Sequence, residues 1–168
     1  MKKHRLQSII MLLAIGLVIQ SCGSSKSAAT TALPSTTTLE CVQISGDGNY
    51  IVEVQSQGKN IEKATESALM DAVKGMLFEG IPGSAANRIQ SQKPLVQDES
   101  VRIGKQDYFQ DFFSSGDYRL YAETLPNAMP KIVKVNGGYK VKVPVILKKQ
   151  LLRKRLEKDG IIKSLSSF

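Results

Sequence analysis

The first 21 residues restrict most strongly which part of the chain can fold into a domain. Lys2, Lys3 and Arg5 precede an apolar run from Ile9 to Ile19, which is broken only by Gly16. A helix needs about 20 apolar residues to span a bilayer, so this run is too short for a permanent membrane helix. A positive start followed by a short apolar run is typical of a signal peptide. We therefore expect residues 1–21 to be removed and the domain to be built from the residues that follow.

The apolar run ends in Ile19-Gln20-Ser21-Cys22, which resembles the lipobox of bacterial lipoproteins. The aliphatic residue at −3, the small residue at −1 and the cysteine at +1 carry the resemblance, whereas Gln20 departs from the usual residue type. The resemblance implies lipidation of the Cys22 thiol with a diacylglyceryl group, and in many bacteria a third acyl chain on its freed amine. Several chains anchor a protein durably because each buried methylene contributes about 0.8 kcal/mol. The membrane is therefore an expected partner.

Residues 22–39 are expected to be a lipidated, flexible tether, because they are small and polar and offer little apolar surface to pack. A coil of this length reaches roughly 20–25 Å from the bilayer. The positions after the cysteine, Gly23 and Ser24, lack the aspartate that retains lipoproteins at the inner membrane of enterobacteria. The expected location is therefore the cell envelope, at the outer membrane in a diderm organism. Residues 40–168 then form one domain.

The first half of this domain carries a strand pattern and then a helix pattern. Asn49 to Gln57 alternates apolar and polar residues, as a strand half covered by a core does. After Asn60, a suitable N-cap, apolar residues recur at three- and four-residue spacing until Gly80. Gly80 to Ser100 is rich in turn formers and is expected to be a long loop. Lys105 to Phe113 is expected to form a helix rich in aromatic residues.

The second half predicts a hairpin and a final helix. Arg119 to Thr124 and Lys131 to Asn136 are expected to be strands, and Asn136-Gly137-Gly138 suits a hairpin turn into a strand from Tyr139 to Leu147. Pro144 predicts an edge position or a bulge for that last strand. A helix from Lys148 to Lys158 should follow. The order predicts an α+β fold: a mainly antiparallel sheet of about four strands, with two or three helices on one face.

A strand followed by Gly-Lys-Asn and an Ala-rich helix, at residues 50–80, resembles the N-terminal domain of flagellar assembly protein T and related small envelope lipoproteins. It is also similar to small envelope lipoproteins of Bacteroidota. The resemblance covers about half of the domain. It implies an accessory or assembly role in the envelope, without catalysis.

The residues for most familiar enzyme mechanisms are missing from the mature chain. His4, the only histidine, lies in the leader, so no Ser-His-Asp triad or histidine metal site is expected. Cys41 has no disulfide partner if Cys22 is lipidated, and it has no histidine to activate it. We expect no catalytic residue, metal or cofactor.

Basic residues gather in the C-terminal quarter, where residues 131–163 hold eleven Lys or Arg and only two acids. A basic helix face is expected to bind an acidic envelope protein or an anionic surface, and an exported domain is not expected to meet nucleic acid. The candidate face consists of Lys149, Arg153, Lys154 and Lys158.

Four aromatic residues offer an alternative function. Tyr108, Phe109, Phe112 and Phe113 either fill the core or line a pocket for a small ligand. The sequence therefore favours a non-enzymatic envelope lipoprotein that binds an envelope protein or an anionic surface. A small-ligand-binding envelope module is the alternative.

Overall fold

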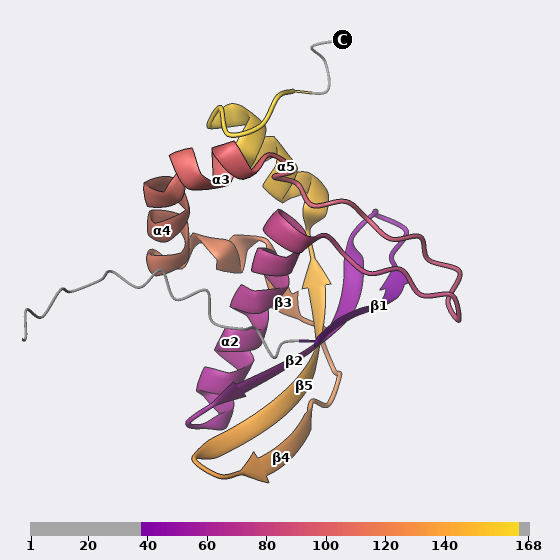
Figure 1. Cartoon of the computed structure of the whole chain (residues 1–168). Coiled ribbons are helices and arrows are strands. Elements are labelled where there is room, and N and C mark those ends of the chain that lie inside the picture. Colours follow the sequence, from indigo (N-terminus) through magenta and orange to yellow (C-terminus); the bar gives the residue numbers. More distant parts are fainter. Residues whose placement is uncertain (1–37, 165–168) are drawn as a thin grey trace, which may run out of the picture. The chain divides into compact units, whose positions relative to one another are not determined.

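The computed structural model describes residues 38–164, and in that part the chain has an α+β fold with helices packed on an antiparallel sheet (Figure 1). The leader and Cys22 lie outside the described residues. The strands are β1 (Thr38–Ile44), β2 (Tyr50–Gly58), β3 (Ala122–Thr124), β4 (Lys131–Val135) and β5 (Gly138–Leu147). The α-helices are α2 (Ile61–Lys74), α3 (Glu99–Gly104), α4 (Gln106–Ser114) and α5 (Lys149–Lys158). A π-helical turn (Gly75–Glu79) extends α2, and a 3₁₀ turn (Asp117–Leu120) precedes β3.

Strand β5 is the centre of the sheet. It pairs with β2 along its whole length, from Tyr50 opposite Leu147 to Gly58 opposite Tyr139. On its other side it pairs with β4 near its start and with β3 at its end. The strand order is β1-β2-β5-β3, with β4 beside β5. The sheet therefore has five strands, and all the pairings are antiparallel.

Pro144 lies in this central strand and pairs with Glu53 in an unbroken register, so both the edge position and the bulge expected from its ring are wrong. Its carbonyl accepts a hydrogen bond from the backbone N–H of Leu125 at 2.9 Å, on the side where β3 and β4 pair with β5. In an extended strand the nitrogen of a residue points to the same side as its carbonyl. The missing N–H therefore faces the break between β3 and β4, where no ladder bond is lost.

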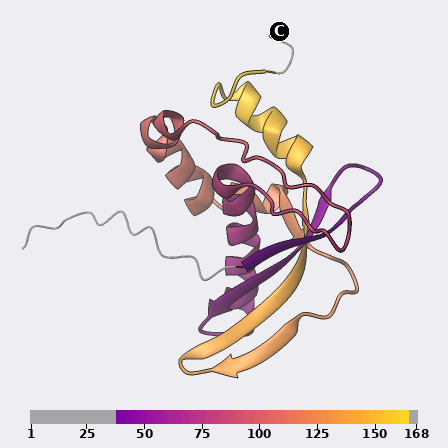
Figure 2. The ribbon, with the colours of Figure 1, turned by 45° about the vertical axis from the view of Figure 1, so that its right-hand side comes forward.

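Helix α2 lies across one face of the sheet, against β2 and β5 (Figures 1 and 2). Asn60 caps its first turn, since the side-chain oxygen accepts from the N–H of Lys63 at 2.8 Å. Three alanines on the stripe toward the sheet are fully buried: Ala64, Ala68 and Ala72. Such small side chains let the helix approach the sheet closely.

The facing side of the sheet supplies the larger side chains of the core. Alternate residues of β2 and β5 are buried, as period-two patterning predicts, and the buried apolar ones are Tyr50, Val52, Val54, Val141, Val143, Val145 and Leu147. Each fully buried valine stabilises the fold by roughly 1.5–3 kcal/mol. Within residues 38–164, the core residues run from Leu39 to Ile162. The described part of the chain thus has one continuous core between the sheet and the helices.

Three local features differ from the sequence prediction. Strand β1 begins at Thr38, inside the expected tether, and a register shift between Cys41 and Gln43 interrupts its alternation. Helix α3 begins at Glu99, at the end of the expected loop. The strand expected from Arg119 is a 3₁₀ turn that leads into the shorter β3.

Candidate functional site: two basic surfaces

The candidate basic face of α5 divides into an inner and an outer half. Lys149 belongs to the inner half: its Nζ lies 3.0 Å from Oε1 of Gln92 and 5.4 Å from the centre of the Tyr50 ring. Burial lowers the pKa of Lys149, and the nearby charge of Arg153 lowers it further. Lys149 therefore connects α5 to the core and to the loop after α2.

Arg153 also forms an ion pair within the domain. Its Nε donates to Oε1 of Glu157 one turn later, at 2.8 Å, and both side chains are largely covered, at 25% and 20% exposure. Lys154 and Lys158 are exposed instead. The four candidate residues therefore form no single face, and only two of them are exposed.

Leu151 joins these two lysines on the outer half. The sequence pattern puts it with Leu152 and Leu156 on the core side, yet it is 50% exposed, whereas the other two are 0% and 1% exposed. Residues three and four apart lie on the same side of a helix. We call Leu151, Lys154 and Lys158 the α5 stripe; it combines one apolar and two cationic side chains.

The C-terminal end of α5 is tied to α4 by a polar cluster that the sequence analysis missed. The hydroxyl of Tyr108 donates to Oδ2 of Asp159 at 2.8 Å, and Nε of Arg155 binds the same carboxylate. Burial raises the pKa of Tyr108 to about 12, with the carboxylate of Asp159 adding to the shift. Arg155 and Tyr108 lower the pKa of Asp159. The cluster thus fixes the orientation of α5.

The four candidate pocket aromatics pack against one another and against neighbouring rings. Phe109 meets Phe78 edge-on at 5.0 Å between ring centres, and Phe112 stacks on Tyr121 at 5.8 Å. Phe109 and Phe112 are buried, whereas Tyr108 and Phe113 are half-buried. Aromatic pairs of this kind contribute about 0.5–1.5 kcal/mol beyond the area they bury. In this structure the cluster therefore occupies the space between α4, the end of α2 and the turn before β3.

An open hollow of about 460 Å³ lies elsewhere, where the loop after α2 passes the start of β1. Its lining is mixed: the polar residues are Glu79, Ser91, Gln92 and Lys93, and the apolar ones are Leu39, Ile81, Pro82 and Pro94. None of the four candidate aromatics lines it.

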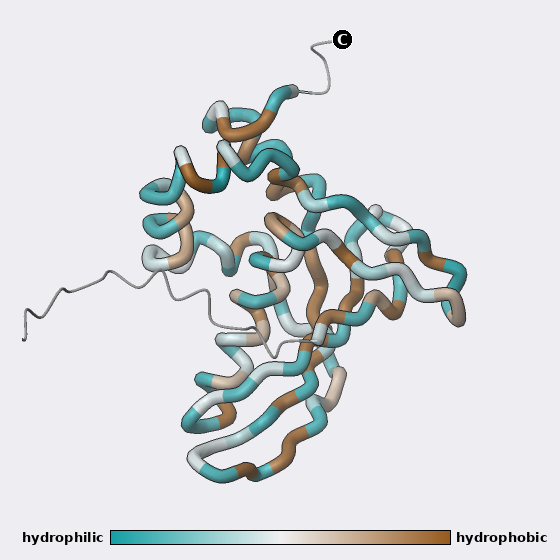
Figure 3. The backbone as a smooth tube through the Cα atoms, viewed as in Figure 1, coloured by the Kyte–Doolittle hydropathy of each residue, from teal (hydrophilic) through white to brown (hydrophobic). Residues whose placement is uncertain are grey.

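A second basic surface lies on the hairpin of β4 and β5, at the opposite end of the sheet from α5 (Figures 1 and 2). Its exposed cations are Lys131, Lys134 and Lys140. Exposed apolar side chains accompany them: Met129 at 91%, Val133 at 59% and Ile132 at 43% exposure. Figure 3 shows hydrophilic and hydrophobic residues mixed along β4. We call these six residues the hairpin surface.

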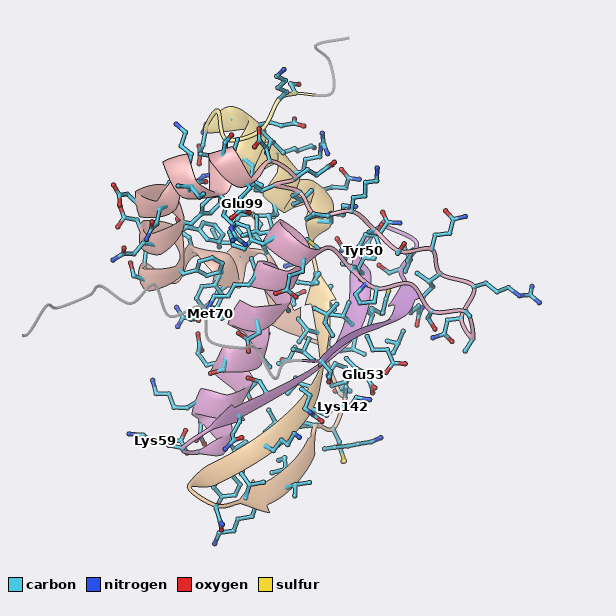
Figure 4. All side chains as sticks on the ribbon, viewed as in Figure 1. Tyr50, Glu53, Lys59, Met70, Glu99 and Lys142 are labelled. Atoms are coloured by element: carbon cyan, nitrogen blue, oxygen red, sulfur yellow. The ribbon has the colours of Figure 1, made fainter. Side chains whose placement is uncertain are left out.

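Lys142 lies beside the hairpin surface but is paired. Its Nζ binds the carboxylate of Glu53 and lies 3.8 Å from Oε2 of Glu40, across the sheet face that α2 does not cover (Figure 4). The hydrogen bond to Glu53 raises the pKa of Lys142. The alternation along β5 puts Lys140 and Lys142 on the same outward side, but it does not show that Lys142 has an ion-pair partner.

Cys41 is fully buried in β1 and packs as a core residue. Burial raises the pKa of its thiol, which keeps the thiol protonated and unreactive. Within residues 38–164, no group of three or more His, Cys, Asp or Glu side chains is placed to hold a metal ion. No helix of that part is long and apolar enough to cross a membrane. Neither a family model, nor a curated protein, nor a solved structure matches this chain.

Proposed function

We propose that this chain is a bacterial envelope lipoprotein, anchored through Cys22 in the outer membrane, whose domain is a non-catalytic binding module. The leader and the Ile19-Gln20-Ser21-Cys22 motif support the anchor. The domain supplies the binding surface. The observation that carries this part is the α5 stripe, where an exposed leucine stands beside two exposed lysines on a helix whose orientation is fixed by the contacts of Tyr108 and Arg155 with Asp159.

The chemistry of the α5 stripe suits an acidic protein of the envelope. Binding surfaces commonly combine an apolar centre with charges that select the partner. The two carboxylates at this end of the helix already have partners, Glu157 in Arg153 and Asp159 in Tyr108 and Arg155. They therefore compete little with a partner for these lysines. The proposed role is therefore to position or assemble another envelope component, which is also the role implied by the resemblance to envelope assembly lipoproteins.

Anchoring is tested by mass spectrometry of the protein purified from its native membrane. We expect the N-terminal peptide of the mature chain to carry acyl mass on Cys22. A Cys22→Ala chain should keep its leader and carry no acyl mass. An unmodified Cys22 in the native protein would contradict the anchor.

Binding is tested with a photo-reactive amino acid at the exposed Gln150, one turn before Lys154. We expect a defined cross-linked product in the native membrane, reduced several-fold by the double change Lys154→Glu and Lys158→Glu because charge reversal on a binding surface is unfavourable. The matched control is Lys93→Glu with Lys105→Glu, which changes the charge equally at exposed sites off α5. Equal products in both variants would remove the α5 stripe from the proposal.

A small-ligand module is the second candidate, and the open hollow beside Gln92 and Lys93 is the observation that favours it. Ligand binding among the aromatics instead requires the cluster of Phe109 and Phe112 to open. Opening would expose apolar rings, which bind the dye anilinonaphthalene sulfonate. We expect no dye fluorescence at 25 °C from the folded domain; strong fluorescence without loss of secondary structure would favour the ligand-binding alternative.

A further inference from the structure

We propose that the hairpin surface docks on an anionic phospholipid bilayer and so orients the domain on the membrane that holds its anchor. The inference rests on the proposed lipid anchor for its biological setting. It deepens the proposed function, because it assigns one end of the domain to the membrane and leaves the α5 stripe for a protein partner.

The hairpin surface exposes more apolar area than a solvated strand requires. Both faces of β4 are exposed, and Ile132 on one face is 43% exposed while Val133 on the other is 59% exposed. Met129, just before the strand, is 91% exposed. Exposed apolar side chains gain free energy when they enter the boundary between lipid headgroups and acyl chains.

The charge of the same residues matches an anionic surface. Lys131, Lys134 and Lys140 are exposed, and no carboxylate of residues 38–164 lies within ion-pair distance of them. Lys131 stands directly opposite Lys142 in the sheet, but the carboxylate of Glu53 is bound by Lys142. A layer of phosphate headgroups supplies the anionic partner that Lys131, Lys134 and Lys140 lack within residues 38–164.

The position of Thr38 connects the hairpin to the anchored end of the chain. Thr38 pairs with Gln55, Gln55 with Lys142, and Lys142 with Lys131, so the four residues form one row across the sheet. Three strand spacings make this row roughly 14 Å long. There are 15 residues between Cys22 and Thr38, and a flexible coil of that length would span about 20 Å. A lipid anchor at Cys22 can therefore hold the hairpin surface against the bilayer.

The two basic surfaces lie at opposite ends of the described domain, as both ribbon views show (Figures 1 and 2). A flat bilayer that contacts the hairpin surface therefore leaves the α5 stripe facing away from the lipid. Lys59 and the turn after β2 lie at the hairpin end (Figure 4), so a further exposed lysine adds to the charge there.

A bilayer fits this surface better than a partner strand added to β4 does. Edge strands that avoid pairing carry lysines and prolines, and β4 has Lys131 and Lys134 within five residues and Pro130 directly before it. The apolar side chains also point to both faces of β4, whereas an added strand would cover neither face.

The test uses the unacylated chain from Ser24 to Phe168, which contains every core residue of the described part, and vesicles of phosphatidylcholine with 30 mol% phosphatidylglycerol. We expect the protein to co-sediment with these vesicles, and much less with pure phosphatidylcholine or in 0.5 M NaCl. Each lysine near an anionic surface raises affinity about fivefold, so Lys131→Gln, Lys134→Gln and Lys140→Gln together should lower it about 100-fold.

Two further variants separate the contribution of the hairpin lysines from general charge and from the apolar side chains. Lys93→Gln, Lys105→Gln and Lys163→Gln remove the same charge from exposed sites off the hairpin, and should change vesicle affinity less than threefold. Met129→Ser with Val133→Ser keeps the charge and should lower affinity several-fold. Circular dichroism checks that each variant is folded; all the changed side chains are exposed.

Absence of binding by the unchanged chain, or an equal loss in both lysine triples, overturns the proposal. Binding to vesicles of either composition with equal affinity also overturns it, since the lysines would then be irrelevant. Because the test chain from Ser24 to Phe168 has no acyl chains, its vesicle binding is independent of the lipid anchor. Mass spectrometry of the native protein decides the anchor separately.

Discussion

The hydroxyl of Tyr108 in α4 donates a 2.8 Å hydrogen bond to Oδ2 of Asp159, 51 residues later in the chain. Asp159 directly follows α5 and also binds Arg155 from the last turn of that helix. Two helices that follow different parts of the sheet are thus connected through one carboxylate. The contact matters for function because α5 carries the exposed stripe proposed to bind a partner.

Replacing Tyr108 with Phe should destabilise the domain by about 1–2 kcal/mol, since a hydrogen bond to a charged group is lost from a half-buried position. Urea unfolding followed by circular dichroism measures the change. Tyr139→Phe is the control, because the Tyr139 hydroxyl has no hydrogen bond within residues 38–164. Equal effects of the two changes would contradict the stabilising role of the Tyr108 contact.

The same contact should make stability depend on alkaline pH. The pKa of Tyr108 is raised from 10.0 to about 12, first by burial and then by Asp159. Between these values the unfolded chain releases the phenol proton while the folded domain keeps it, so the free energy of unfolding falls as pH rises. The stability difference between the natural chain and Tyr108→Phe should therefore shrink from pH 10 to 12. Urea titrations at three pH values in this window measure it; a constant difference counts against the shift.

The central features of the fold could be predicted because their patterns are regular. Alternation identified β2 and β5, and the alanine stripe identified α2. β1 was missed because the register shift after Cys41 breaks the alternation. The prediction for Pro144 was wrong because the sequence shows only that its backbone N–H is missing. It does not show that this N–H would face the gap between β3 and β4, where no hydrogen bond is lost.

The candidate surfaces were harder to predict, because a lysine has the same sequence signature whether it is paired or exposed. Lys149 reaches Gln92, 57 residues earlier, and Lys142 reaches Glu53 on the neighbouring strand. Both contacts depend on tertiary structure. The hairpin surface became visible only when β4 proved to be exposed on both faces.

A side chain at Gly138 should disrupt the base of the hairpin surface. A Cβ there would lie 2.1 Å from the carbonyl oxygen of Gly58, and a backbone atom has little freedom to move away. Gly138→Ala should therefore destabilise the domain by about 2 kcal/mol or more, as strongly strained substitutions do. Gly46→Ala is the control, since nothing lies within 4 Å of the added atom. Thermal unfolding compares the midpoint temperatures of the two variants. Similar midpoints would show that the backbone at Gly58 and Gly138 can move apart without loss of stability.

Adjacent leucines in α5 should respond very differently to the same truncation. Leu152 is fully buried, so Leu152→Ala should cost about 2–5 kcal/mol, because it removes buried methyl groups and leaves a cavity. Leu151 is 50% exposed, so Leu151→Ala should change stability by less than about 0.5 kcal/mol.

Urea unfolding gives both values, and the photo-cross-link from Gln150 gives binding in the same proteins. If Leu151 belongs to a partner surface, its truncation should weaken the cross-link while leaving the domain stable. A large loss of stability from Leu151→Ala would instead show that Leu151 packs in the core, as the helical pattern of the sequence predicts.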